Sequence, residues 1–335
     1  MKEAASSNLA TTLGAGYFPP DKIVGGRWKI VKQIGQGSNG MVFMVDDLRS
    51  PPPFSSAALK LEVAANRIKL EAYILEKVGG HRNIPQLLAS GKNESFRFMV
   101  MKLLGNPISH NQRLLGKLPV ASVCRVGIDV LLAIKSLHSA GFLHRDIKAL
   151  NMCIGYWGTP EEKHVFLVDY GAAREFTGKN SKGETGMKVA RTEPVIRGTM
   201  RYNSIRVHDR IEAGRGDDLF MLLYTLAELA AGSLPWAREM TEEQITECKR
   251  TTSDELLLAA FPKRMQAIPA LLRAIYNILT RVYDKCPANE RTVEWPWEWE
   301  MSRDGAWQAE RWNRKEERAK RQADLLFLQE NPLGI

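Results

Sequence analysis

The sequence contains few cysteines. Its four, Cys124, Cys153, Cys248 and Cys286, lie far apart, with no C-x-x-C pair and no histidine at ligand spacing. This pattern excludes a zinc finger and a disulfide framework. It predicts small, buried thiols in a reducing compartment.

Long apolar runs are also missing. The most apolar stretch, from Leu219 to Ala231, still contains Tyr224 and Glu228, so it predicts a buried helix and not a membrane span. The first residues lack a basic start followed by an apolar core, which is the mark of a secretory signal. We therefore expect no membrane association and a cytoplasmic or nuclear location.

The composition is that of an ordinary globular protein. At 335 residues, the chain is long enough for one large domain or two coupled domains. Its 44% hydrophobic and 25% charged residues exclude a disordered or fibrous chain. The net charge of +9 suits a phosphorylated or acidic partner, nucleic acid or an anionic membrane surface.

The order of apolar patterns predicts a small β-rich lobe followed by a larger helical one. Strand-like alternation runs through 28–60 and returns at 96–104, with one helix over 66–78 between them. Helices are expected over 121–141, 218–232 and 265–283, and an irregular basic segment over 172–197. The predicted parts are a mobile extension (1–22), a β-rich lobe (23–104), a helical lobe (105–300) and a charged, helical tail (301–335).

A glycine-rich motif lies between two predicted strands. It reads Gly35-x-Gly37-x-x-Gly40-x-Val42. A dinucleotide-binding loop would instead open a helix. The hairpin form is the one that covers ATP phosphates in protein kinases. A plain glycine-rich turn is the alternative for this motif taken alone.

A lysine on the next predicted strand and a glutamate on the following predicted helix come after the glycine motif. Lys60 lies on the next strand, where it can reach the α- and β-phosphates, and Glu71 lies on the following helix, where it can hold that lysine. Glu76 is the second candidate for this partner and Glu62 a poorer third.

The strongest motif is His-Arg-Asp-Ile-Lys-Ala-Leu-Asn over 144–151. Phosphoryl transfer needs a carboxylate near the attacking hydroxyl, a cation on the γ-phosphate and an amide oxygen on Mg²⁺. Asp146, Lys148 and Asn151 supply these groups within six positions. Asp169, in Val-Asp-Tyr-Gly, adds a second metal-binding carboxylate.

With these motifs in order, residues 27–300 resemble a protein kinase of the casein-kinase-one group. The segments RWKIVKQIGQGSNGMVF, VMKLLG, HRDIKALN, RGTMRYNSI, GRGDDLFMLLYTLAELAAGSLPW and PWEWE are similar to its tau-tubulin kinase branch. The resemblance implies an α+β bilobal kinase fold and Mg²⁺-dependent transfer from ATP to Ser/Thr of proteins. It also implies Ser/Thr specificity from Lys148 together with Thr199.

The resemblance assigns an ATP site. Met101 would be the gatekeeper and Lys102 to Leu104 the hinge that pairs with adenine. Val42 and Ala58 would roof the ring, and Cys153 would form its floor. The full ATP-binding set comprises Ile34, Gly35, Gly37, Gly40, Val42, Ala58, Lys60, Glu71, Met101, Lys102, Leu104 and Cys153.

The resemblance also suggests acidic or already phosphorylated substrates. Arg201 matches a family position that binds an anion, and the activation segment is rich in basic residues, which form charge-assisted contacts with phosphate or carboxylate. The alternative is that these residues only solvate a loop. The basic residues are Arg174, Lys179, Lys182, Lys188, Arg191, Arg197, Arg201, Arg206 and Arg210.

Two departures from the family pattern bear on activity. Tyr170 replaces the usual Phe, and Ala149-Leu150 replace Pro-Asp or Pro-Ser. A pseudokinase or scaffold is the alternative to an active enzyme, but Lys60, Asp146 and Asp169 are all present. Nucleic-acid binding rests on charge alone, and we do not expect it.

Overall fold

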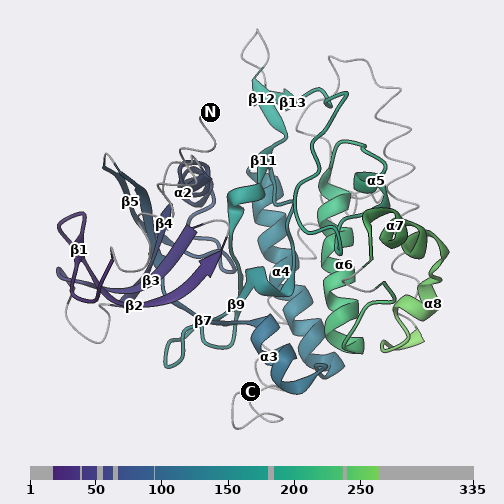
Figure 1. Cartoon of the computed structure of the whole chain (residues 1–335), viewed down its shortest axis with the longest axis horizontal. Coiled ribbons are helices and arrows are strands. Elements are labelled where there is room, and N and C mark those ends of the chain that lie inside the picture. The colour runs from purple at the N-terminus through teal and green to yellow at the C-terminus, as the bar shows by residue number, and fades with distance from the viewer. Residues whose placement is uncertain are drawn as a thin grey trace, which may run out of the picture. The chain divides into compact units, whose positions relative to one another are not determined.

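The computed structural model describes residues 18–37, 40–50, 56–62, 67–93, 95–179, 185–236 and 240–263. The chain divides into two compact units, residues 1–176 with 190–267, and residues 177–189 with 268–335. Within the first unit, a β-rich lobe is followed by a helical lobe, which confirms the expected α+β class (Figure 1).

The N-terminal lobe is built on a six-stranded sheet of order β1-β2-β3-β4-β6-β5, with antiparallel neighbours. Side chains alternate along β3 between buried and half-buried positions, the pattern of a strand with one face on the core. The strands are β1 (Ile23–Val24), β2 (Trp28–Gly37), β3 (Gly40–Asp47), β4 (Ser56–Glu62), β5 (Leu87–Lys92) and β6 (Arg97–Lys102).

Aromatic side chains fill the core of this lobe. Phe18 is 2% exposed and lies against Phe43 and Phe96, with ring centroids 5.7 and 5.2 Å away. Phe18 therefore belongs to the folded lobe, and the expected boundary of a mobile extension after residue 22 lies too late. Residues 1–17 of that extension fall outside the described part.

Helix α2 (Arg67–Lys77) packs on the sheet where the apolar spacing predicts a helix. Its buried face contains Ile68, Ile74 and Leu75, and it also contains Glu71, which is fully buried. A charged residue in such a position requires a partner.

The C-terminal lobe consists mainly of helices, with two small sheets beside them (Figure 1). Helix α6 is buried on nearly all sides, as its apolar sequence predicts, and Gly232, at φ 89°, ends it. Among the described helices, none is long and apolar enough to cross a membrane. The helices are α3 (Ile108–Leu115), α4 (Val120–Ser139), α5 (Ile205–His208), α6 (Arg215–Ala231), α7 (Glu242–Thr251) and α8 (Asp254–Leu257).

Short strands connect the catalytic motifs. One sheet has the order β10-β9-β7, and β8 pairs with β11. The second unit contains the hairpin of β12 and β13, where the sequence predicted irregular chain. The helix expected over 265–283 and the tail from 301 lie outside the described residues. The strands are β7 (Leu104–Pro107), β8 (Phe142–Leu143), β9 (Met152–Gly155), β10 (Val165–Leu167), β11 (Arg174–Glu175), β12 (Thr177–Lys179) and β13 (Thr185–Met187).

Gly40 closes the glycine hairpin in a conformation that side chains rarely adopt. Its φ is 111°, and a Cβ there would lie 2.2 Å from the carbonyl oxygen of Leu61 on β4. A Cβ on Gly35 would instead meet the Val42 side chain at an ordinary 3.6 Å. Of these two positions, only position 40 has a backbone conformation and a close contact that require glycine.

Gly40→Ala should lower the free energy of unfolding by about 1–3 kcal/mol, because the new Cβ combines backbone strain with a clash. Differential scanning fluorimetry would show this as a lower Tm. Gly35→Ala is the matched control and should leave Tm nearly unchanged. Equal Tm values for the two variants would contradict the strain argument.

Candidate active site

The partner of Lys60 is Glu71. The Lys60 Nζ lies 2.7 Å from Glu71 Oε2 and 3.0 Å from Asp169 Oδ1. Of the two alternatives, Glu76 is exposed, and Glu62 accepts a hydrogen bond from the backbone of Ile68 at 3.1 Å. The structure therefore brings β4, α2 and the Asp169 loop together at one ammonium group.

The pKa values of this cluster reflect its burial. Burial alone would lower the pKa of Lys60, but Glu71 and Asp169 outweigh it and raise that pKa. Burial, only partly offset by Lys60, raises the pKa of Glu71 to about 7. The lysine is therefore a fixed positive charge at the position where phosphates would bind.

Tyr170 fits its position without disturbing this cluster. Its backbone N–H donates to Glu71 Oε1 at 2.8 Å, and its hydroxyl donates to the carbonyl of Leu167 at 2.8 Å. The hydroxyl that distinguishes tyrosine from the usual phenylalanine thus has its own acceptor. Burial raises the pKa of this phenol well above its usual range.

The Asp146 carboxylate lies at the centre of the catalytic loop. Its Oδ2 accepts from Lys148 Nζ at 2.8 Å, and its Oδ1 accepts from Thr199 Oγ1 at 2.8 Å. Lys148 also donates to the Thr199 hydroxyl at 2.9 Å. Asn151 Nδ2 donates to the carbonyl oxygen of Asp146 at 2.8 Å and so fixes the shape of the loop.

Asp218, near the start of α6, binds the backbone of this loop. Its two carboxylate oxygens accept from the backbone N–H groups of His144 and Arg145, at 2.9 and 2.8 Å. These bonds tie the first turn of α6 to the backbone of the catalytic loop. His138 Nε2, 2.7 Å from Asp218, is a partner that the sequence did not predict.

The hinge candidates lie beside the predicted roof of the ATP site. Ala58 on β4 is opposite Met101 on β6, and Val42 is opposite Lys60. The Lys102 backbone N–H donates to Gln86 at 3.0 Å. Glu161, which the sequence did not single out, binds the Lys102 side chain at 2.5 Å.

Two more ATP-site candidates lie on the strands below the hinge. Leu104 on β7 pairs with Gly155 on β9, and Cys153 on β9 is opposite Phe166. Burial raises the pKa of the Cys153 thiol to about 12, so this side chain acts as a small apolar group. Ile34, at the start of the glycine hairpin, is 46% exposed.

Asn151 and Asp169 lie on neighbouring segments. The backbone N–H of Val168, the residue before Asp169, donates to the carbonyl of Asn151 at 2.9 Å, so the two segments are hydrogen-bonded to each other. Within the described residues there is no group of three or more His, Cys, Asp or Glu side chains arranged for a metal. Mg²⁺ typically uses one or two such oxygens together with substrate phosphates, so these residues fit it.

Arg201 requires a correction. Its Nε and Nη2 donate to Glu228 Oε1 at 3.0 and 2.7 Å, and its Nη1 donates to the carbonyl of Trp236 at 2.7 Å. The side chain is 11% exposed. The guanidinium is therefore already neutralised by a buried carboxylate of α6, and the structure does not support it as an anion site.

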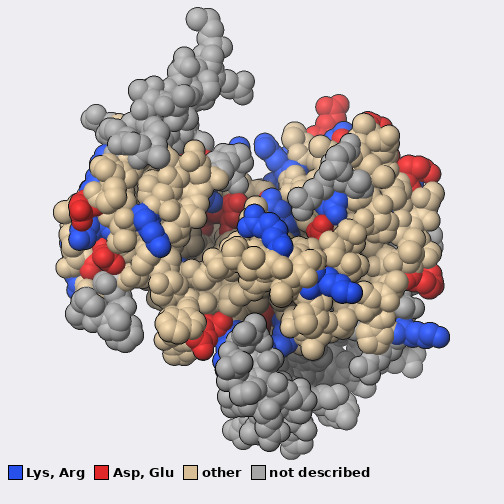
Figure 2. Space-filling view, turned by 60° about the horizontal axis from the view of Figure 1, so that its bottom comes forward, with Lys and Arg blue, Asp and Glu red and all other residues tan. Residues whose placement is uncertain are grey.

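Figure 2 shows acidic and basic side chains side by side in the hollow between the lobes.

The protein kinase domain model matches residues 28–296. The chain belongs to the protein kinase family. A Caenorhabditis elegans protein named as a serine/threonine-protein kinase is 36% identical over 257 residues, 75% of this chain and 73% of the relative.

Two further relatives of this kinase are similar over most of its length. A C. elegans protein named as a casein kinase I is 31% identical over 302 residues, 85% of this chain and 86% of the relative. A serine/threonine-protein kinase of Dictyostelium discoideum is 29% identical over 298 residues, 85% of this chain and 58% of the relative.

Glu71→Gln should reduce kcat/KM for ATP by about 10- to 100-fold, because a hydrogen bond to a charged group contributes about 1.5–3 kcal/mol. Steady-state kinetics with varied ATP would measure it. Glu76→Gln, a matched change on the exposed face of α2, should stay within about twofold of the wild type. A larger loss in Glu76→Gln than in Glu71→Gln would overturn the assignment.

Proposed function

We propose that this kinase transfers the γ-phosphate of Mg-ATP to serine or threonine hydroxyls of proteins. The observation that carries the proposal is the arrangement of Asp146, Lys148 and Thr199, joined by hydrogen bonds of 2.8–2.9 Å. The names of its relatives support the same class. We also propose that it falls in the casein-kinase-one group, near the tau-tubulin kinase branch, as the motif similarity suggests.

Asp146 is the proposed base. Its carboxylate orients the substrate hydroxyl and accepts the proton as the oxygen attacks the γ-phosphorus. The bond from that phosphorus to the β–γ bridging oxygen breaks, and ADP leaves. Lys148 neutralises charge on the transferred group, while Lys60 holds the α- and β-phosphates.

Asn151 and Asp169 would hold Mg²⁺. When bound, the metal neutralises charge on the phosphate oxygens. The glycine hairpin would cover the phosphates, and the backbone of Lys102 to Leu104 would pair with the adenine edge. Val42, Ala58 and Cys153 would enclose the ring in an apolar slot.

Acidic or primed substrates are the proposed class, with Arg197 as the residue that recognises them. Arg197 is exposed, and within the described part of the chain no carboxylate lies at ion-pairing distance from it. It precedes Gly198, where a Cβ would lie 2.1 Å from the Arg145 carbonyl, so this segment runs against the catalytic loop. A free guanidinium there suits a phosphate or carboxylate of the substrate.

The second candidate function is a scaffold that binds partners through an inactive kinase fold. The intact ion pair between Lys60 and Glu71 and the ordered Asp146 carboxylate favour the enzyme. Absence of nucleic-acid and membrane partners, and a cytoplasmic or nuclear location, remain predictions.

Asp146→Asn should reduce phosphate transfer by about 10²- to 10⁴-fold, because it removes the proton acceptor while keeping the shape of the side chain. Transfer of labelled γ-phosphate to casein and to an acidic Ser/Thr peptide would measure it. ATP affinity should stay near the wild-type value. ATP binding without transfer by the wild-type chain would favour the scaffold.

Arg197→Gln should lower kcat/KM for an acidic or primed peptide by about two- to fivefold, the strength of an exposed ion pair, and leave a matched neutral peptide unchanged. Arg201→Gln provides the contrast. It leaves Glu228 without its ion pair, so losses on both peptides should be equal. A loss specific to acidic peptides in Arg201→Gln alone would restore Arg201 as the anion site.

A further inference from the structure

Glu212, in the loop between α5 and α6, binds two arginines of the activation segment. Its Oε2 accepts from the Arg174 Nη1, and Arg191 donates to the two carboxylate oxygens, from Nε at 2.7 Å and from Nη2 at 2.9 Å. The backbone N–H of Arg191 adds a fourth contact at 3.3 Å. The Glu212 side chain is 12% exposed and that of Arg174 19%, whereas the Arg191 side chain is 41% exposed. Solvent therefore screens the ion pair with Arg174 less than the ion pair with Arg191.

The two arginines lie on either side of residues 177–189 in the sequence. Arg174 lies on β11, just after the Asp169 motif, whereas Arg191 follows the stretch 177–189, which belongs to the second unit. Glu212 thus joins the point where the chain leaves the first unit to the point where it returns.

A third guanidinium belongs to this cluster. Arg145, which precedes the base Asp146, donates to the carbonyl oxygens of Ala172 and Ala173 at 2.9 and 3.4 Å. Burial, together with the nearby charges of Arg174 and Arg191, lowers its pKa to about 10. The three cations are therefore close enough to repel one another, and the carboxylates of Glu212 and Asp218 counter this repulsion at Arg145.

The electrostatics of Glu212 agree with this role. Burial alone would raise its pKa, but Arg191 and Arg174 outweigh burial and lower it to about 2. The carboxylate is consequently ionised at neutral pH, where it supplies a negative charge.

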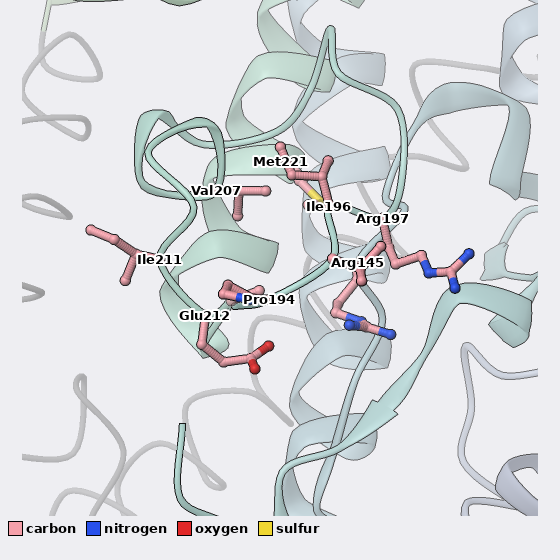
Figure 3. A pocket seen from close by; sticks show the side chains of 10 residues that line it. Arg145, Pro194, Ile196, Arg197, Val207, Ile211, Glu212 and Met221 are labelled. Atoms are coloured by element: carbon pink, nitrogen blue, oxygen red, sulfur yellow. The ribbon is translucent and has the colours of Figure 1, made fainter. Parts of the chain in front are cut away.

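The chain after Arg191 is anchored next to this cluster. Pro194 and Ile196 line a pocket together with Val207 and Met221, and the charged ends of Glu212, Arg145 and Arg197 point away from these apolar groups (Figure 3). A shift of Arg191 would weaken the packing of Pro194 and Ile196 in this pocket.

Thr199 lies three residues beyond Ile196 and donates a hydrogen bond to Asp146. Displacement of the segment would therefore disturb this hydrogen bond to the proposed base. In many protein kinases, a phosphate added to the activation segment pairs with arginines and orders that segment. Here the Glu212 carboxylate, from the helical lobe, already pairs with arginines of this segment, as such a phosphate would.

We propose that Glu212 is a positioning residue that holds the activation segment in its active arrangement without phosphorylation of that segment. This inference rests on the proposed kinase function. It assigns to Glu212 an effect on phosphate transfer and not on ATP binding, because Lys60, Glu71 and Asp169 form a separate set of contacts.

The test compares Glu212→Gln with Glu242→Gln. Glu242 on α7 also pairs with an arginine, Arg210, at 3.2 Å, and it is the matched control. Glu212→Gln should lower kcat for a protein substrate at least tenfold and leave the Kd for ATP within twofold. Glu242→Gln should match the wild type, and wild-type protein treated with phosphatase should keep its activity.

Several results would overturn the proposal. Wild-type kcat in Glu212→Gln, an equal loss in Glu242→Gln, or loss of wild-type activity after phosphatase treatment would each do so. If Glu212→Gln does not fold, Arg174→Gln/Arg191→Gln removes the same ion pairs without leaving both cations unpaired. Its kcat must also fall at least tenfold.

Failure of the proposed function has a different signature. A wild-type chain that binds ATP but transfers no phosphate would contradict kinase activity and leave positioning to be tested by limited trypsin digestion. Glu212→Gln should then be cut between residues 175 and 197 at least threefold faster than the wild type. Unchanged cleavage would overturn the role of Glu212 by itself.

Discussion

The catalytic loop depends on one buried carboxylate, that of Asp218. Burial alone would raise its pKa, but His138 and the loop backbone lower it, so the group stays charged inside the helical lobe. An isolated buried charge is costly, so Asp218 must keep its partners. Two of those partners are the backbone N–H groups of His144 and Arg145, and Arg145 adopts a left-handed φ of 65°. The position of Asp146 follows from these bonds.

The same physical device recurs at other points of the site. Glu71 holds Lys60 within the N-terminal lobe, Glu228 holds Arg201 in the loop after Thr199, and Glu212 pairs with two arginines of the activation segment. Each acid comes from a helix or from the loop beside one, and each cation from a strand or a loop. Ion pairs thus connect the helices and their neighbouring loops to other segments of the site, and these pairs join residues that are distant in sequence.

Local sequence patterns predicted the parts of the fold whose signals are local. Glycine spacing, the motif around Asp146 and the apolar periodicity of α2, α4 and α6 all lie within short windows. Helix α7 escaped because its sequence is polar. Its capping box, in which Thr241 and Gln244 bond reciprocally, was a local signal that could have revealed it. Strand β5 contains a glycine and little apolar alternation, so only its pairing with β6 defines it.

Pairings between distant residues could not be read from local patterns. Glu228 lies inside an apolar helix pattern, and nothing near it in sequence indicates that it would bind Arg201. The same holds for Glu212 and its two arginines. Motifs predicted which side chains perform the chemistry, because their spacing within a loop is fixed by that chemistry. The motifs could not predict which other charged side chains are left unpaired and so are able to bind a substrate.

This difference changes how the positive charge of the chain is interpreted. A net charge of +9 and a basic activation segment suggested a broad anion-binding surface. In the folded chain, Arg191 and Arg201 are paired with Glu212 and Glu228. A guanidinium paired with a carboxylate contributes little field outside the protein, since the two charges cancel at a distance. Arg197 differs from these two: it is exposed beside the catalytic loop, and no carboxylate among the described residues lies at ion-pairing distance from it, which is why the proposed recognition of acidic substrates is assigned to it.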